Sequence, residues 1–235
     1  MVTVIPLSRS TTGVLPLELL GRVEQGEHLH ALLWRAGSGW RMISSAVLGG
    51  GIGERAWVLN AQVSHGYRRT DPACHLADLA GDAGVKGRGV GLMTAADVQA
   101  HGRAHDEGVE AVATAGLGVR GWAAAPADGS AAPAAPGTIN IIAALPVTLT
   151  DAALVNAVIT ATEAKVQALL DAGYDCSGTP TDAVCIAARL PGPGEEIHEF
   201  AGPRSLWGAR LARAVHEAVR IVASPGLHGD GLTTG

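Results

Sequence analysis

Aromatic residues, cysteines and clustered positive charges are all scarce in this sequence. Five Trp, two Tyr and one Phe among 235 residues leave the packing of a core to Ala, Val, Leu and Ile, within a hydrophobic content of 47%. The three cysteines, Cys74, Cys176 and Cys185, have no CxxC spacing, which argues against a disulfide framework and a structural zinc site. The net charge is −5 without a Lys/Arg stripe, which argues against a nucleic-acid partner because phosphate contacts need concentrated basic charge.

The sequence also shows neither a signal peptide nor an obvious membrane-spanning segment. Residues 1–10 lack the apolar segment of a signal peptide, and no apolar run looks long enough to span a bilayer. The sequence therefore predicts a cytoplasmic protein without a membrane partner.

The length of the chain suits a single domain, which we expect over residues 1–226, followed by a flexible tail over 227–235. Residues 123–136 are a low-complexity segment of Ala and Pro. Because such a segment cannot build a core, it predicts a surface loop within the domain and no domain boundary.

Two short apolar runs, residues 139–145 and 183–188, flank a long helical pattern. Each run has the length of a buried strand. The helix is expected from about 151 to 171, with Thr150 or Asp151 offering a side-chain oxygen to its first N–H groups. The sequence predicts that the two runs are neighbouring strands of one sheet and that the helix packs on that sheet.

At 100° per residue, this helix carries one wide apolar stripe. Lys165 falls inside one margin of the stripe and Glu163 lies at the opposite margin. A lysine on a buried face needs a carboxylate or a water-filled cleft, because an unpaired buried charge is costly, and Asp182 is the first partner expected. The alternative is that Lys165 snorkels to the surface. The stripe consists of Leu154, Val155, Val158, Ile159, Val166, Leu169 and Leu170.

Glycines and hydroxyls mark further candidate positions. Gly49 and Gly50 belong to a glycine-rich run that fits either close approach to a ligand or a plain turn between strands. Thr94 and Thr114 each end a predicted strand, where ligands gather in α/β proteins, although capping or packing is the alternative. His65 could act as a base or orient a substrate. A metal site at His65 and His75 would need a third ligand, and neither HxxxH nor HExxH is present, so no metal site is predicted.

Taken together, these segments resemble the adenosylcobinamide amidohydrolase family, whose members salvage corrinoids. The resemblance spans roughly residues 40–220. Two departures concern residues 117–120, where the family often has an Asn, and Pro180, where a glycine is expected. The resembling blocks are Ser44-Ser45-Ala46-Val47-Leu48-Gly49-Gly50, Gly91-Leu92-Met93-Thr94-Ala95-Ala96, Thr114-Ala115-Gly116, Gly137-Thr138-Ile139-Asn140, Thr162-Glu163-Ala164-Lys165, Gly178-Thr179-x-Thr181-Asp182-Ala183, Ala201-Gly202-Pro203 and Leu206-x-Gly208.

The resemblance implies hydrolysis of the amide that joins the aminopropanol arm to the corrin ring of adenosylcobinamide. It also implies that cobalt arrives within the substrate, so no cofactor bound by the protein is expected. Two alternatives stay open: a corrinoid-binding protein without catalysis, and an amidohydrolase acting on another amide. Self-association is left open as well.

An amide hydrolase needs an activated water or hydroxyl, a proton shuttle and donors to the oxyanion. Within the resembling blocks we assign Glu163 as general base or acid, Lys165 and Asn140 as electrostatic or oxyanion partners, Asp182 as the orienting group and Ser45 as a reserve nucleophile. The candidate substrate-binding residues are Ser44, Gly49, Gly50, His65, Thr94, Thr114, Thr138 and Thr181. The residues expected to converge on one cleft are Ser44, Ser45, Thr94, Thr114, Asn140, Glu163, Thr181 and Asp182.

The fold class predicted is α/β (α+β), as one layered domain with a mixed β-sheet flanked by helices. The alternative is a four-layer α/β/β/α sandwich. Self-cleaving amidohydrolases of that architecture use a Ser or Thr that follows a small residue, and Gly137-Thr138 could mimic this arrangement.

Overall fold

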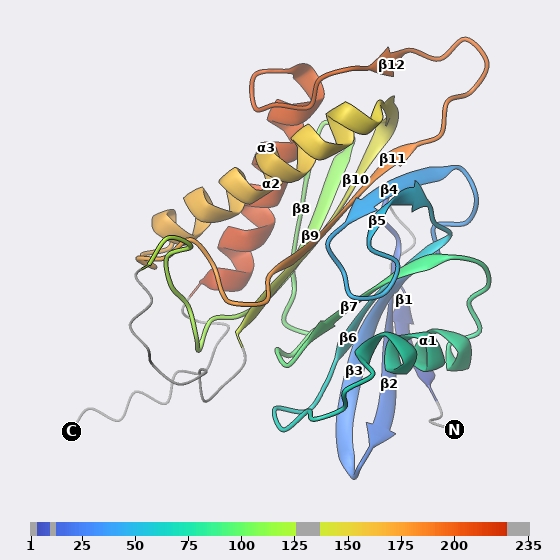
Figure 1. The fold of residues 1–235 in the computed structure, drawn as a ribbon, viewed down its shortest axis with the longest axis vertical. Helices are drawn as coiled ribbons and strands as arrows, with labels where there is room; N and C mark the ends of the chain where they lie inside the picture. The colour runs from blue at the N-terminus through green and yellow to red at the C-terminus, as the bar shows by residue number, and fades with distance from the viewer. Residues whose placement is uncertain (1–3, 10–12, 126–136, 225–235) are drawn as a thin grey trace.

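The computed structural model describes residues 4–9, 13–125 and 137–224, which form two β-sheets and three helices (Figure 1). Sheet A contains, in spatial order, β1 (Ile5–Arg9), β2 (Leu17–Glu24), β3 (Glu27–Trp34), β6 (Trp57–Gln62) and β7 (Gly89–Thr94). Sheet B contains β5 (Gly51–Glu54), β4 (Trp40–Ser44), β11 (Ala183–Arg189), β10 (Thr138–Leu149), β9 (Val109–Gly116) and β8 (Gly102–Asp106), with β12 (Ile197–His198) paired to β10. The helices are α1 (Pro72–Asp82), α2 (Asp151–Asp171) and α3 (Leu206–Ala223).

Both sheets are mixed, which confirms the predicted fold class. In sheet A, β6 and β7 are parallel and the other pairs are antiparallel. In sheet B, β10 is parallel to β11 and to β12, and the remaining pairs are antiparallel.

Three buried clusters separate four layers of secondary structure. Helix α1 covers the outer face of sheet A, the two sheets face each other, and α2 and α3 cover the outer face of sheet B (Figure 1). The protein therefore has two sheets where one was expected, and the four-layer alternative describes the arrangement. Representative members are Leu33 and Leu76 between sheet A and α1, Trp34, Met42 and Ile142 between the two sheets, and Ile141, Ile186 and Val215 between sheet B and the helices α2 and α3.

Strand β10 shows why the sequence left the number of sheets open. Ile139, Ile141 and Ala143 face α2 and α3, while Ile142 and Ala144 face sheet A, because successive side chains of a strand point to opposite faces. A strand buried on both faces reads as a continuous apolar run. Such a run does not reveal whether a helix or a second sheet covers each face.

The predicted strand–helix–strand unit is confirmed. Strands β10 and β11 are neighbours, with Asn140 opposite Ala183 and Ile142 opposite Cys185. Helix α2 begins after Thr150, whose side chain accepts a hydrogen bond from the Ala153 N–H at 3.1 Å. This cap satisfies one of the N–H groups that lack partners at a helix start.

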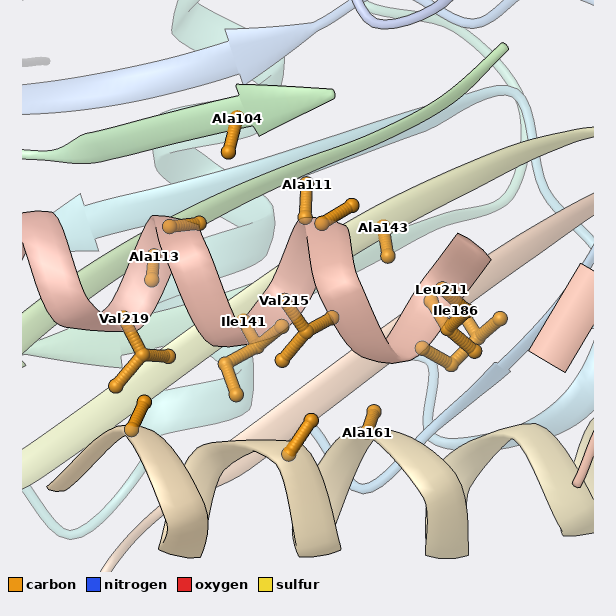
Figure 2. Packing of buried hydrophobic residues seen from close by; sticks show 14 of the residues in the cluster. Ala104, Ala111, Ala113, Ile141, Ala143, Ala161, Ile186, Leu211, Val215 and Val219 are labelled. Carbon is orange, nitrogen blue, oxygen red and sulfur yellow. The ribbon is translucent and has the colours of Figure 1, made fainter. Parts of the chain in front are cut away.

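The buried face of α2 is mostly alanine; of the predicted stripe, only Leu154 and Leu169 are fully buried. Ala157, Ala161 and Ala168 are fully buried, whereas Val155 and Ile159 are about half exposed, at 48% and 51%. Figure 2 shows side chains of α2, α3 and sheet B meeting in one core, with Ala161 facing Val215. Small side chains let the helix backbone approach its neighbours closely, so the other large apolar residues of α2 lie at the rim or outside.

Helix α2 is also long and apolar enough to match a membrane span by length and composition. The expectation that no run reaches such a length therefore needs correction for this helix. Half of its most apolar window is buried inside the protein, as in a core helix that packs on a sheet.

The predicted C-terminal tail over 227–235 lies outside the described residues, as does most of the predicted loop over 123–136. The part of that loop that is described, residues 123–125, is exposed.

Candidate functional site

A cleft of about 750 Å³ lies where strand ends of both sheets meet. Sheet A contributes the C-terminal ends of β6 and β7 and the segment after β6, and sheet B contributes the end of β4 and the beginnings of β10 and β11. The walls mix hydroxyl, carboxyl, imidazole and apolar groups. The lining residues are Ser45, Val47, Val63, Ser64, His65, Tyr67, Pro72, Leu92, Met93, Thr94, Ala95, Gly137, Thr138, Pro180, Thr181, Asp182 and Ala183.

The alternation of strand side chains places polar residues at this end of the inter-sheet core. In β10, Thr138 and Asn140 share a face with Ile142, and in β7 Thr94 shares a face with Leu92. The face that is apolar at the middle of the molecule thus becomes polar toward the strand ends, where the cleft opens.

Six of the predicted site residues converge on the cleft, although they are far apart in the sequence. They are Ser45, His65, Thr94, Thr138, Thr181 and Asp182. Ser44, Thr114 and Asn140 are buried and do not line the cleft. Gly49, Gly50, Glu163 and Lys165 do not line it either.

Asp182 is the anchor of the segment that precedes β11. Its Oδ2 accepts hydrogen bonds from Lys165 Nζ at 2.5 Å and from the Thr179 N–H at 3.2 Å. Its Oδ1 accepts from the Ile139 N–H at 2.9 Å and from Thr179 Oγ1 at 2.5 Å. The predicted pairing of Lys165 with Asp182 is confirmed. Lys165 as a whole residue is only 8% exposed. With four donors on its two oxygens, Asp182 fixes this loop against β10 and α2.

The position of Gly178, before Thr179 and Asp182, has no room for a side chain. A Cβ on Gly178 would lie 2.2 Å from Asp182 Oδ2 and 2.6 Å from Lys165 Nζ. Any larger residue would therefore collide with the ion pair, which explains why glycine starts the Gly-Thr-x-Thr-Asp segment.

Thr138 and Thr181 form a pair of hydroxyls on the cleft wall. Their Oγ1 atoms are 2.5 Å apart, and Thr181 Oγ1 donates to the Gly137 carbonyl at 2.8 Å. Since each hydroxyl has one proton, the Thr138 proton points at the Thr181 oxygen. In this arrangement Thr138 is paired with another hydroxyl and with no base, which disfavours the nucleophile role considered for it.

Asn140 belongs to a buried network that joins the two sheets. Its Nδ2 donates to Asn60 Oδ1 at 2.8 Å and to the Met93 carbonyl at 3.0 Å, and Asn60 Nδ2 donates to Thr114 Oγ1 at 3.0 Å. Both amide protons of Asn140 are thus engaged, which leaves none for the oxyanion role proposed from the sequence. Asn140 Oδ1 has no hydrogen-bond partner among the described residues. Asn60 was missed as a site neighbour, although a polar residue inside an apolar strand run is a signal for such a network.

Two serines and two glycines at the end of β4 and just after it were predicted to belong to the site. Ser44 Oγ donates to the Val184 carbonyl at 2.8 Å, which ties β4 to β11. Ser45 is exposed, and its Oγ accepts from the Val184 N–H at 3.1 Å. A Cβ on Gly49 would lie 1.9 Å from the Gly89 carbonyl oxygen, and one on Gly50 would lie 2.6 Å from that of Ala46. These contacts explain glycine at both positions as part of the turn between β4 and β5, and neither glycine lines the cleft.

Glu163 lies on the exposed side of α2 and away from the cleft. The prediction that it would be partly desolvated at the cleft is wrong. Residues two apart on a helix point in nearly opposite directions, so the inward direction of Lys165 turns Glu163 outward.

Ser64 and Tyr67 line the cleft but were not among the predicted site residues. They follow the end of β6, and ligand-binding groups are expected in such loops after strands. Among the described residues, no group of three or more His, Cys, Asp or Glu side chains is placed to hold a metal ion.

Comparison with known proteins gives the family. The model of the family described as adenosylcobinamide amidohydrolase matches residues 16–224. The chain belongs to the adenosylcobinamide amidohydrolase family. This confirms the resemblance inferred from the motif blocks.

Two curated relatives carry the name adenosylcobinamide amidohydrolase. The protein from Methanosarcina mazei is 31% identical over 182 residues, which cover 75% of this chain and 86% of the relative. The protein from Halobacterium salinarum is 41% identical over 117 residues, which cover 48% of each chain. A crystal structure from Pyrococcus horikoshii OT3 aligns over 94% of this chain and 82% of its own, with 13% identity and a TM-score of 0.41.

The two departures from the family pattern differ in their relation to the cleft. Pro180 lines the cleft, so its ring contributes to the shape of one wall. The segment 117–120 lies outside the lining, where Arg120 donates to the Leu117 carbonyl at 2.9 Å and stacks over Tyr174. Of the two departures, only Pro180 lies in the cleft wall.

Proposed function

We propose that this protein hydrolyses the amide between the aminopropanol arm and the corrin ring of adenosylcobinamide, in corrinoid salvage. The products are adenosylcobyric acid and the amino-alcohol. The observation that carries this proposal is that family blocks from four distant parts of the sequence line one cleft: Ser45, Thr94, Thr138 and Thr181-Asp182.

The cleft suits a large amphipathic ligand. Its volume lies within the roughly 300–1,000 Å³ typical of small-molecule sites. Val47, Val63 and Leu92 offer apolar contact to a macrocycle, and the hydroxyls can bond to its amide side chains. Thr94 Oγ1 accepts from the Ala96 N–H at 3.0 Å, so its own proton stays available for a substrate carbonyl.

Our proposal includes a cytoplasmic enzyme that needs no protein-bound cofactor, because cobalt enters with the corrinoid. The direct test is incubation of the purified protein with adenosylcobinamide and a search by mass spectrometry for a corrinoid with a new carboxylate. Release of the acid supports the proposal. Corrinoid binding without product would favour a binding protein, and hydrolysis of other amides alone would favour a different amidohydrolase.

The position of Glu163 gives a first prediction for this assay. Glu163→Gln should leave turnover and KM within about twofold of wild type, because the side chain is exposed on α2 and distant from the lining residues. The measurement is steady-state hydrolysis of adenosylcobinamide. A loss of roughly 10²-fold, the scale of general acid–base catalysis, would return Glu163 to the mechanism.

A further inference from the structure

Three titratable side chains form a continuous chain that begins at the cleft wall. The Tyr67 hydroxyl lies 3.1 Å from His75 Nδ1, and His75 Nε2 lies 3.1 Å from Glu24 Oε1. The rings of Tyr67 and His75 stack with an interplanar angle of 8°. His75 is only 3% exposed, whereas Tyr67 lines the cleft. The three residues therefore connect the cleft to the Glu24 carboxylate, whose side chain is 16% exposed.

Each member of this chain is held by a different element. Tyr67 follows β6 in a turn closed by its own N–H to the Ser64 carbonyl at 3.0 Å. His75 lies in the first turn of α1, and Glu24 ends β2. The chain therefore joins β2, the segment after β6 and helix α1.

Arg22 fixes the carboxylate of Glu24. Its Nε donates to Glu24 Oε2 at 3.1 Å, and its other nitrogens donate to the carbonyls of His30 and Gln62. Oε1 is thereby left to His75. The arrangement orders a carboxylate, an imidazole and a hydroxyl in the sequence that a proton relay requires.

The protonation states follow from burial and from these partners. Burial lowers the pKa of His75 below its ordinary value, although nearby Glu24 opposes the shift, so the imidazole is neutral near pH 7. Burial raises the pKa of Tyr67, so the phenol keeps its proton. A carboxylate only accepts hydrogen bonds, which places the imidazole proton on Nε2 and leaves Nδ1 to accept from the phenol.

We propose that Tyr67 is a catalytic residue that carries protons between the cleft and His75, with Glu24 as a positioning residue. This inference rests on the amide hydrolysis proposed above. Water attacks the amide carbon and gives a proton to the Tyr67 oxygen, while the phenol proton passes to His75 Nδ1. The C–N bond then breaks as the proton returns from His75 through Tyr67 to the amine nitrogen. One water is consumed, and a carboxylic acid and an amine are released.

Tyr67→Phe is the decisive variant, because it keeps the stacked ring and removes only the hydroxyl. We expect kcat to fall by roughly 10²-fold or more, with KM and the melting temperature close to wild type. Tyr174→Phe is the matched control at the chain's other tyrosine, which packs under Arg120 away from the cleft and should behave as wild type. Turnover within about threefold of wild type in Tyr67→Phe would overturn the relay.

His75→Gln separates a relay from a mere contact between α1 and sheet A. If the two residues act in one path, Tyr67→Phe and His75→Gln combined should cost little more turnover than either alone. Multiplied losses in the double variant would contradict the relay. The melting temperature of His75→Gln shows whether this variant is folded. If it is not folded, Tyr67→Phe alone tests the relay.

The pH profile provides a readout that a structural role would not change. The kcat/KM of wild type should fall as pH drops through the pKa of His75, which burial lowers from its ordinary value, because a protonated imidazole cannot accept the phenol proton. This limb should vanish from the residual activity of Tyr67→Phe, and its persistence there would contradict the relay. The charged and titratable groups that surround His75 are Glu24 and Arg22 from β2 and Tyr67, Arg69 and Asp71 from the segment before α1.

Failure of the relay and failure of the function give different results in one assay. If wild type yields no acid from adenosylcobinamide, the proposed function fails and the relay fails with it. If wild type and Tyr67→Phe yield acid equally fast, only the relay is overturned.

Discussion

Single polar residues fix the shape of the cleft. The clearest case is the ion pair of Lys165 and Asp182, in which the side chains are only 10% and 16% exposed. Asp182 also accepts from the Ile139 and Thr179 N–H groups. The pair therefore joins α2, β10 and the segment before β11, and it supports the wall that contains Thr181.

Removal of one partner should be costly, because it leaves the other charge buried without compensation. We expect Asp182→Ala to lower the free energy of unfolding by about 3–5 kcal/mol, and Lys165→Met combined with Asp182→Asn to recover part of that loss. Denaturant unfolding measures both. The matched control is Glu217→Ala, which breaks an exposed pair with Arg220 on α3 and should cost less than about 1 kcal/mol. Equal effects of Asp182→Ala and Glu217→Ala would contradict the structural role.

At the scale of elements, small residues set how closely the helices approach sheet B. Alanines form most of the buried face of α2, and Gly102 of β8 lies under the backbone of α3. A Cβ at Gly102 would come 1.9 Å from the Ala218 carbonyl oxygen. The packing of α3 on β8 thus requires glycine at this position, because backbone cannot move aside as a side chain can.

Gly102→Ala should therefore destabilise the protein by about 1–3 kcal/mol or more, as overpacking does. Gly118→Ala is the control, since a Cβ there would have no neighbour within 4 Å. The two melting temperatures give the comparison. A Gly102→Ala variant as stable as Gly118→Ala would show that α3 can shift without cost.

At the scale of the whole molecule, the cleft depends on the packing of the two sheets. The inter-sheet core contains residues of both, including Trp34 and Leu92 from sheet A and Met42 and Ile142 from sheet B. The polar network of Asn60, Thr114 and Asn140 crosses the same interface. Separation of the sheets would expose this core and open the cleft, so we expect the two sheets to unfold together.

Ile142→Ala tests this expectation. It should lower the free energy of unfolding by about 2–5 kcal/mol, the range for large-to-small core changes, and tryptophan fluorescence and circular dichroism should still give one coincident transition. Val155→Ala on the exposed side of α2 should change stability by less than about 0.5 kcal/mol. Two separate transitions would contradict a shared core.

The sequence by itself determined the local units, the fold class and the family. Apolar runs with a capping Thr150 were enough to place β10, α2 and β11, because strand length, helix period and capping are local properties. A lysine on an apolar helix face required a carboxylate, and Asp182 followed from the motif that precedes β11. The motif blocks gave the family, and six of the candidate residues do reach one cleft.

Only the tertiary structure decided which faces are buried and which side chains meet. Periodicity shows that a face is apolar but not what covers it, so the second sheet was only an alternative in the sequence. A hydropathy pattern emphasises large side chains, whereas alanine allows the closest packing of a helix on a sheet. Helix α2 therefore packs mainly through its alanines, and in that orientation Glu163 faces outward. The contact of His75 with Glu24 joins residues 51 positions apart, on α1 and β2. No local pattern encodes such a contact, because it exists only once the helix has docked on the sheet.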